Sequence, residues 1–176
     1  EIGPIRPPSE ASSLMLRVTR NCPWNQCKFC GLYKGKKFSI RPVEHVKKDI
    51  DMLRNNINRI STAMYPKDPV PQNLMALIDG KDREEQFAFH SALNWYKGGM
   101  KSVFLQDANT LIIKPDDLVE ILNYLRGLFP EIQRITSYAR SHTIARIRDG
   151  DMARFEAAGL NRIHIGMESA ADDVLD

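Results

Sequence analysis

The sequence predicts an α/β fold built around a parallel sheet of four strands. Short apolar segments of strand type alternate with longer segments of helical period, and this order is typical of parallel sheets joined by right-handed crossovers. The chain has 176 residues, 43% of them hydrophobic, which suits one domain with a substantial core. All three cysteines lie between positions 22 and 30, directly after the first predicted strand. Together these observations predict one α/β domain with a chemically special loop at a strand end.

The chain begins with a predicted extended arm, residues 1–13, which is rich in proline and serine, and the core domain is expected to span residues 14–176. The segment LMLRVT at residues 14–19 predicts the first strand, which runs straight into the cysteine loop. Residues 41–55 predict the first helix, because apolar side chains recur there at helical spacing and Pro42 suits a first helical position. These apolar side chains are Val43, Val46, Ile50 and Leu53.

A proline-rich insertion is expected near residues 61–82, with three prolines between positions 65 and 72. Residues 83–99 predict the second helix, since Glu84 and Glu85 suit its first turn and a pair of glycines ends it. The insertion therefore separates two helices before the regular part of the chain begins.

The second half of the chain alternates regularly between strands and helices. Strands are predicted at residues 101–106, 132–138 and 161–167. An amphipathic helix is predicted at residues 114–130, and another at least from position 151 to 159. Each helix therefore connects two neighbouring parallel strands.

Both ends of the chain look cut. There is no initiator methionine, and the last residues, MESAADDVLD, stop inside what reads as a new helix. Ser169 is the candidate N-cap of that helix, and Asp172 and Asp173 would lie in its first turn. We therefore expect a fragment of a longer protein.

The composition of the chain limits which cellular compartment and which kinds of partner we expect. No stretch approaches the roughly 18 consecutive apolar residues of a membrane span, and the N-terminus lacks the apolar run of a secretory signal. We therefore expect a reducing cytoplasm, where clustered cysteines indicate a metal site or redox chemistry. The net charge of +3 allows an RNA partner without favouring one, although lysines crowd around the cysteine loop.

Unusual residues follow each predicted strand at its carboxyl end. The cysteines follow the first strand, QDAN the second, SYARS the third and MES the fourth. Parallel α/β folds gather their connecting loops at these ends and place their chemistry there. The pattern therefore predicts one functional site.

The cysteine spacing C-x4-C-x2-C, formed by Cys22, Cys27 and Cys30, suits a single metal centre on a short loop. Three thiolates leave an open position on a tetrahedral zinc or on one iron of a four-iron cluster. A fourth cysteine, which a ferredoxin-type cluster would need, is absent from the sequence. The spacing most naturally indicates a four-iron cubane cluster with three protein ligands and one iron left free.

Two other interpretations of the cysteines stay open. A non-catalytic structural zinc module would close its site with a histidine, although none has tight zinc-finger spacing to the cysteines. An interaction or assembly domain would keep the thiols free and reduced. The candidate histidines are His45, His90, His142 and His164.

The three cysteines, the aromatic Phe29 before the third of them, and the strands RITSYARS and RIHIGMES resemble the radical S-adenosylmethionine enzymes over roughly residues 14–176. The resemblance implies a partial (β/α) TIM-like barrel, here truncated after the fourth strand. It implies that Cys22, Cys27 and Cys30 hold a [4Fe–4S] cluster whose free iron chelates S-adenosylmethionine. The family's commonest spacing is C-x3-C-x2-C, so this chain has one extra residue in the first gap.

The resemblance also implies roles for other side chains in binding S-adenosylmethionine. Phe29 would pack near the adenine, and Glu168 would accept hydrogen bonds from the ribose hydroxyls. Ser137 and Arg140 would meet the carboxylate. Asp107 or Asn109 would receive the amino group, in a QDAN segment that replaces the glycine-rich segment usual in the family.

The activity implied by the resemblance is that of a radical enzyme. The reduced cluster would cleave S-adenosylmethionine to a 5′-deoxyadenosyl radical, which abstracts hydrogen from a substrate that the sequence does not identify. The electron would come from a donor such as flavodoxin or ferredoxin. The truncated chain by itself is expected to be of doubtful competence.

Overall fold

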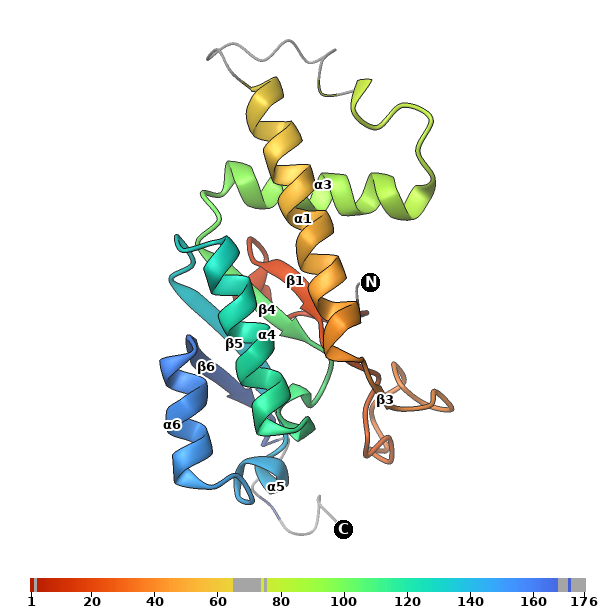
Figure 1. Ribbon diagram of the computed structural model, residues 1–176. Coiled ribbons are helices and arrows are strands. Elements are labelled where there is room, and N and C mark those ends of the chain that lie inside the picture. Colours follow the sequence, from red (N-terminus) through yellow and green to blue (C-terminus); the bar gives the residue numbers. More distant parts are fainter. Residues whose placement is uncertain (2, 65–73, 75, 168–170, 172–176) are drawn as a thin grey trace.

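A parallel sheet of four strands, in the order β1-β4-β5-β6, forms the centre of the computed structural model (Figure 1). The structure describes residues 1–176 except 2, 65–73, 75, 168–170 and 172–176. The parallel α/β prediction is confirmed, with β1 and β6 at the two edges of the sheet in the described part of the chain. The strands are β1 (Leu14–Arg17), β4 (Ser102–Gln106), β5 (Arg134–Ala139) and β6 (Leu160–Ile165).

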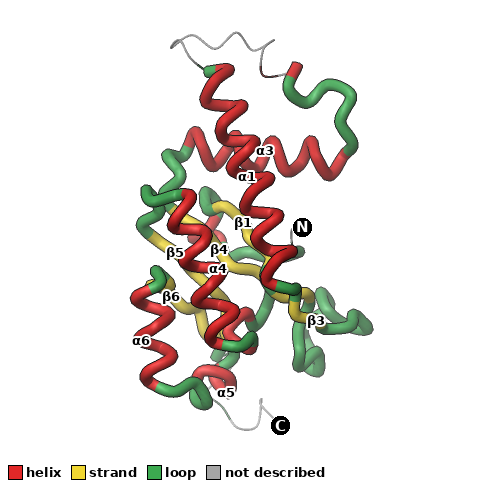
Figure 2. The backbone as a smooth tube through the Cα atoms, viewed as in Figure 1, coloured by secondary structure: helices red, strands yellow, loops and turns green. Residues whose placement is uncertain are grey.

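Helices cover one face of this sheet. The helix α4 lies between α1 and α6 in front of the strands, and α3 crosses behind α1 (Figures 1 and 2). The carboxylate of Asp82 caps α3 by accepting a hydrogen bond of 2.9 Å from the backbone N–H of Glu85. The helices are α1 (Val43–Ala63), α3 (Arg83–Lys97), α4 (Pro115–Leu128), the short α5 (Ser141–Ile144) and α6 (Asp149–Ala157).

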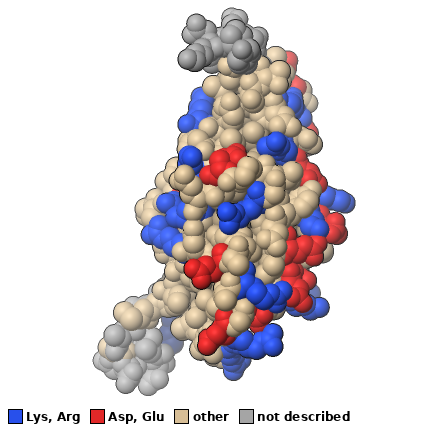
Figure 3. Space-filling model, turned by 60° about the vertical axis from the view of Figure 1, so that its left-hand side comes forward, with Lys and Arg blue, Asp and Glu red and all other residues tan. Residues whose placement is uncertain are grey.

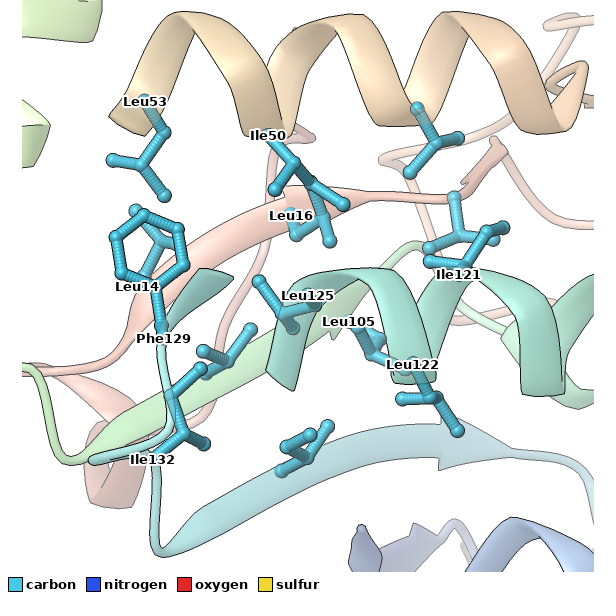
Figure 4. Packing of buried hydrophobic residues seen from close by; sticks show 14 of the residues in the cluster. Leu14, Leu16, Ile50, Leu53, Leu105, Ile121, Leu122, Leu125, Phe129 and Ile132 are labelled. Carbon is cyan, nitrogen blue, oxygen red and sulfur yellow. The ribbon is translucent and has the colours of Figure 1, made fainter. Parts of the chain in front are cut away.

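The apolar core fills the space between the helices and the sheet (Figure 4). Leu14 and Leu16 alternate along β1 toward the helices, and Leu105 of β4 does the same, because every second residue of a strand faces the same side. Each such side chain stabilises the fold by about 1.5–3 kcal/mol when it is fully buried. The side chains that meet them come from α1, from α4 and from the segment between α4 and β5, and they include Ile50, Leu53, Ile121, Leu122, Leu125, Phe129 and Ile132.

A tryptophan fastens α3 to the sheet. The indole Nε1 of Trp95 donates a hydrogen bond of 2.7 Å to the carbonyl oxygen of Ser102, and its ring packs edge-on against Phe129 with centroids 5.1 Å apart. Gly99 then adopts a φ of +77°, a conformation that glycine reaches without steric cost, and the chain turns from α3 into β4. Trp95 therefore links α3 directly to the strand that follows it.

A two-stranded antiparallel ribbon carries the cysteine loop. It consists of β2 (Thr19–Arg20) and β3 (Ser39–Ile40), and residues 21–38 form the loop between them. The predicted strand at residues 14–19 is therefore divided between the parallel sheet and this ribbon. The loop projects from the sheet beside the start of α1 (Figure 1).

The N-terminal arm crosses the opposite, inner face of the sheet. Its short helix η1 (Pro8–Glu10) contacts β4, and the Gln106 amide accepts from Gly3 N–H at 2.7 Å and donates to the Ile5 carbonyl at 2.7 Å. Because side chains alternate along a strand, Gln106 points away from the helix-facing Leu105. The arm therefore covers the face that the helices leave uncovered.

Several predicted boundaries shift. The first helix runs from 43 to 63 instead of 41 to 55, so its end lies inside the predicted insertion, and Pro42 precedes the helix as its N-cap. The separate helix α5 precedes α6, which begins at Asp149. The helix predicted from Ser169 lies outside the described residues. In the described part of the chain, no helix combines the length and apolar character needed to cross a membrane.

Candidate functional site

The loop at residues 21–38 holds Cys22, Cys27 and Cys30 as free thiols, each partly exposed. The backbone N–H of Cys30 donates to the carbonyl oxygen of Cys27 at 3.2 Å, which forms a tight turn between the last two thiols. The two cysteines separated by two residues therefore share one turn, while Cys22 lies at the start of the loop.

Two asparagines allow the loop to fold back on itself. Asn21 and Asn25 have φ values of +65° and +51°, a left-handed conformation that asparagine tolerates better than most residues. The side-chain amide of Asn21 donates to the Lys37 carbonyl at 2.7 Å, and that of Asn25 donates to the Lys36 carbonyl at 3.3 Å. The asparagines on either side of Cys22 therefore join the outgoing and returning halves of the loop.

A buried carboxylate anchors the base of the loop at the carboxyl end of β4. Oδ2 of Asp107 accepts from the backbone N–H of Asn21 at 2.8 Å, and Oδ1 accepts from the Tyr33 hydroxyl at 3.4 Å. Asn21 directly precedes the first cysteine and Tyr33 follows the third, so one side chain holds both ends of the cysteine segment. The Asp107 side chain is fully buried, and Arg17 lies beside it as its charge partner.

Arg17 and Tyr33 complete this anchor. The Arg17 guanidinium donates to Oδ2 of Asp107 from Nε at 3.0 Å and from Nη2 at 2.7 Å, a strong charge-assisted arrangement. Burial raises the pKa of Tyr33, and the nearby charges of Asp107 and Cys22 raise it further. The Tyr33 hydroxyl therefore stays protonated and remains a hydrogen-bond donor to the carboxylate.

At the neighbouring strand end, Asn109 organises the turn after β5. Its Oδ1 accepts from the backbone N–H of Arg140 at 3.1 Å, and its Nδ2 donates to the Thr143 hydroxyl at 2.9 Å. Asn109 is fully buried. Ser137 is also fully buried and donates from Oγ to the Tyr138 carbonyl at 3.1 Å. Both polar side chains are therefore engaged by the protein itself.

Arg140 connects this turn to the cysteine loop. Its guanidinium carbon lies 4.6 Å from the centroid of the Trp24 ring, a cation–π contact. Trp24 is 45% exposed, and Phe29 is 69% exposed. The loop thus touches the ends of both β4 and β5 and still presents two aromatic rings to the surroundings.

A cavity of about 540 Å³ adjoins these residues. Pro23 of the cysteine loop, Asn109 and Arg140 line one part of it, and a mixture of apolar, polar and charged side chains lines the rest. Its basic side chains outnumber its single acid, Asp151, so it suits a ligand with both an apolar part and an anionic group. The basic residues in its lining are Arg140, His142, Arg146 and Arg148.

The charge distribution elsewhere is mixed. Basic and acidic side chains are interspersed over the face shown in Figure 3, in keeping with a net charge of only +3. An extended basic surface would be the electrostatic mark of nucleic-acid binding. The face in view therefore does not favour an RNA partner.

The structure brings several predicted site residues together, but the three thiols are not arranged as a preformed metal site. Within the described ranges, no group of three or more His, Cys, Asp or Glu side chains is arranged to hold a metal ion. A closed zinc site of three cysteines and one of the predicted histidines is therefore not preformed there. The donor set itself, three free thiols on one loop, fits an iron–sulfur cluster, and binding one would draw the sulfurs together. Glu168 lies outside the described residues.

Sequence reasoning missed Arg17 and Tyr33. Tyr33 carried a usable signal, because a large aromatic residue in a lysine-rich loop is expected to pack against something, and in the structure it is only 2% exposed. Arg17 carried a weaker one, a charged residue inside a short apolar strand. Neither signal identifies Asp107 as the shared partner, since that contact spans 90 residues from Arg17.

Comparisons with known proteins add no assignment, since no family model, curated protein or solved structure matches this chain.

Proposed function

We propose that this chain is the cluster-binding part of a radical S-adenosylmethionine enzyme, built on the first strands of a partial (β/α) TIM-like barrel. One observation carries the proposal: the loop with all three thiols contacts the carboxyl ends of two parallel strands, through Asp107 at one and Arg140 at the other. This is where parallel α/β folds bind their ligands.

Cys22, Cys27 and Cys30 would hold a [4Fe–4S] cluster as thiolates. When bound, the cluster would supply the electron that reductively cleaves S-adenosylmethionine. The protein's own part is to position the loop, and Asp107 does so by holding Asn21 on one side of the thiols and Tyr33 on the other. Arg17 holds that carboxylate in place through two hydrogen bonds.

The remaining residues divide into ligand-binding and positioning groups. Arg140 lines the cavity and offers a guanidinium suited to a carboxylate, and the Trp24 ring packs against that guanidinium. Asn109 acts as a positioning residue, because both ends of its amide are already bonded within the turn after β5. Phe29 is exposed and free to cover an aromatic ring of the ligand.

An acidic electron-donor protein, of the flavodoxin or ferredoxin kind, suits the outer side of the loop. Lys34, Lys36 and Lys37 are exposed there, next to the thiols that would hold the cluster. Complementary charge speeds the encounter between such partners.

Anaerobic reconstitution of the full chain with iron and sulfide tests the proposal. We expect about four irons per chain and, after reduction, an EPR signal that changes when S-adenosylmethionine is added. Cys27→Ala should lose the cluster, and Asp107→Asn should bind iron but give a broader, heterogeneous signal, because the loop would lose its anchor. A Cys27→Ala protein that retained the full iron content would contradict the ligand assignment.

A matched control separates the cluster from adventitious metal. The substitution Cys27→Ser keeps the approximate size of the side chain but replaces the thiol by a hydroxyl, and it is expected to lose most of the iron. A stoichiometric zinc that survives the reconstitution, with no effect of S-adenosylmethionine, would instead support the structural zinc module. Tyr33→Phe, which removes only the hydroxyl, should fall between Asp107→Asn and the unchanged protein in EPR heterogeneity.

A further inference from the structure

The inner face of the sheet contains a second polar centre, away from the cysteine loop, at the side chain of Glu10. This carboxylate is fully buried, although it belongs to the N-terminal arm. Its Oε2 accepts from the Ser13 hydroxyl at 2.5 Å and from Nη2 of Arg134 at 3.2 Å, and its Oε1 accepts from the Thr136 hydroxyl at 2.9 Å. Both oxygens are therefore bound by donors.

Two arginines lie near this single carboxylate, so the positive charge around it exceeds its one negative charge. Arg134 pairs with it directly, and Nη1 of Arg162 lies 3.6 Å from Oε1. The imidazole Nε2 of His164 lies 3.9 Å from the same oxygen. In the part of the chain that the structure describes, this His164 nitrogen and Nε of Arg134 are buried without a hydrogen-bond partner. The sheet therefore offers donors that Glu10 does not use.

The groups around Glu10 come from a rigid frame, whereas Glu10 itself comes from the arm. Arg134 and Thr136 lie on β5, and Arg162 and His164 lie on the neighbouring β6, with Thr136 directly opposite Arg162 in the strand register. The contact between Glu10 and Thr136 spans 126 residues of sequence. The cations and the hydroxyl are therefore placed by the sheet ladder, independently of the segment that carries the carboxylate.

The ionisation of Glu10 agrees with this arrangement. Burial by itself would raise the pKa of Glu10, but hydrogen bonds from Ser13, Thr136 and Arg134, with the charge of Arg134, lower it overall. The site therefore favours the anion over the neutral acid, as a site selective for carboxylates must.

We propose that Arg134, Thr136 and Arg162, with His164 at their side, form a carboxylate-binding site on the inner face of the sheet, and that Glu10 of the arm is its internal ligand. The external ligand class is a small monocarboxylate, because the donors bind two oxygens of one planar group. A molecule of this class binds where the Glu10 side chain is absent or withdrawn. This site goes beyond the proposed cluster chemistry and does not depend on it.

Removal of the internal ligand followed by its replacement from solution tests the site. Glu10→Ala in the full chain should lower the midpoint of thermal unfolding by roughly 4–8 °C, the range expected for the loss of a few charge-assisted hydrogen bonds. Sodium acetate should then raise the midpoint of Glu10→Ala in a saturable way, relative to sodium chloride at equal ionic strength. The unchanged protein, whose site is filled, should show no such difference between the two salts.

Two control variants sharpen the result. Glu44→Ala removes a carboxylate that is 75% exposed on α1, and it should respond to acetate and chloride alike. Glu10→Ala combined with Arg134→Gln should lose the acetate effect, because the main charged donor is gone. An equal acetate effect in Glu10→Ala and the unchanged protein, or one that survives Arg134→Gln, would overturn the proposal.

A measurement on the unchanged protein keeps the proposal testable if Glu10→Ala does not fold. Titration of the Glu10 carboxyl carbon by NMR should give a pKa below 4.5, and Thr136→Val should raise that value. A Glu10 carboxyl that titrates at its ordinary value, with no response to Thr136→Val, would show that the sheet does not bind the carboxylate.

Discussion

The two faces of the sheet are covered by different chemistry. The outer face packs leucine, isoleucine and phenylalanine side chains from α1, α3 and α4 against β1, β4 and β5. The inner face carries the arm, with Gln106 bonded to its backbone and Glu10 bonded to the strands. Apolar packing is non-directional and tolerates exchange, whereas a buried polar group costs free energy unless each bond is made. The outer face therefore supplies stability, and the inner face determines where particular segments lie.

The largest loss of unfolding free energy is expected from a substitution in the apolar core between the helices and the sheet. Phe129→Ala removes a fully buried ring that packs against Trp95, and the loss of burial plus the cavity should cost about 3–5 kcal/mol of unfolding free energy. Urea unfolding followed by circular dichroism measures this. Phe87→Ala is the matched control, because Phe87 is 53% exposed on α3 and should change the free energy little. Equal losses in both variants would contradict the packing described for α3 and α4.

A smaller and more local effect is expected at the anchor of the cysteine loop. Asp107→Asn leaves Arg17 without its buried charge partner and should cost about 3 kcal/mol. Hydrogen exchange should also accelerate at the backbone amide of Asn21, which donates to the lost carboxylate oxygen. Asp79→Asn, at an exposed aspartate, should stay within about 0.5 kcal/mol of the unchanged protein. Unchanged exchange at Asn21 would rule out the anchoring role.

Acid should weaken the contacts that Glu10 makes on the inner face of the sheet. The pKa of Glu10 is lowered in the folded protein, so its contribution is complete above pH 4.5 and is lost as the pH falls through the folded value. The groups that face Glu10 are Arg134, Arg162, His164 and Tyr138.

The unfolding free energies of the unchanged protein and Glu10→Gln, compared between pH 6 and 3, measure that contribution. The difference should be about 2 kcal/mol at pH 6 and should shrink toward pH 3. The pKa of Glu1 is lowered to about 2, chiefly by its hydrogen bond from Arg20. Acid therefore also removes a stabilising contribution of Glu1, but it does so equally in the unchanged protein and in Glu10→Gln. A difference that stays constant or grows on acidification would contradict an ionised Glu10.

The smallest effect is expected at the outer contact of the cysteine loop. Trp24→Leu removes the cation–π contact with Arg140 and should cost about 0.5–1 kcal/mol, the range for exposed pairs. Phe29→Leu, on the same loop and 69% exposed, should leave the unfolding free energy unchanged. A double-mutant cycle measures the contact between Trp24 and Arg140. The double variant should lose less unfolding free energy than the two single variants added together, because each single variant already loses the shared contact.

Local sequence determined most of the secondary structure. The periodicity of Val46, Ile50 and Leu53 predicted α1, and the apolar run before QDAN predicted β4, because helices and strands impose spacings of 3.6 and 2 residues on buried side chains. The end of α1 was harder to predict, since residues 56–63 continue the helix into a segment that proline composition marks as irregular.

The site was predictable only in outline. The cysteine loop, Asn109 and Arg140 lie at the carboxyl ends of parallel strands, where the alternating pattern had placed them. The partners of Asp107 were not predictable, because its carboxylate was expected to face a ligand and instead holds Asn21 and Tyr33 within the protein. A single sequence shows that a residue is polar without showing which distant group it meets.

The sequence by itself determined the α/β alternation and the grouping of three thiols on one loop, because both depend on spacings of a few residues. Only the tertiary structure decided that Asp107 anchors that loop, 86 residues from Asn21, and that Glu10 lies beneath β5 and β6. The physical reason is that a buried charge is stable only where several donors converge on it, and the sheet brings those donors together from distant parts of the chain.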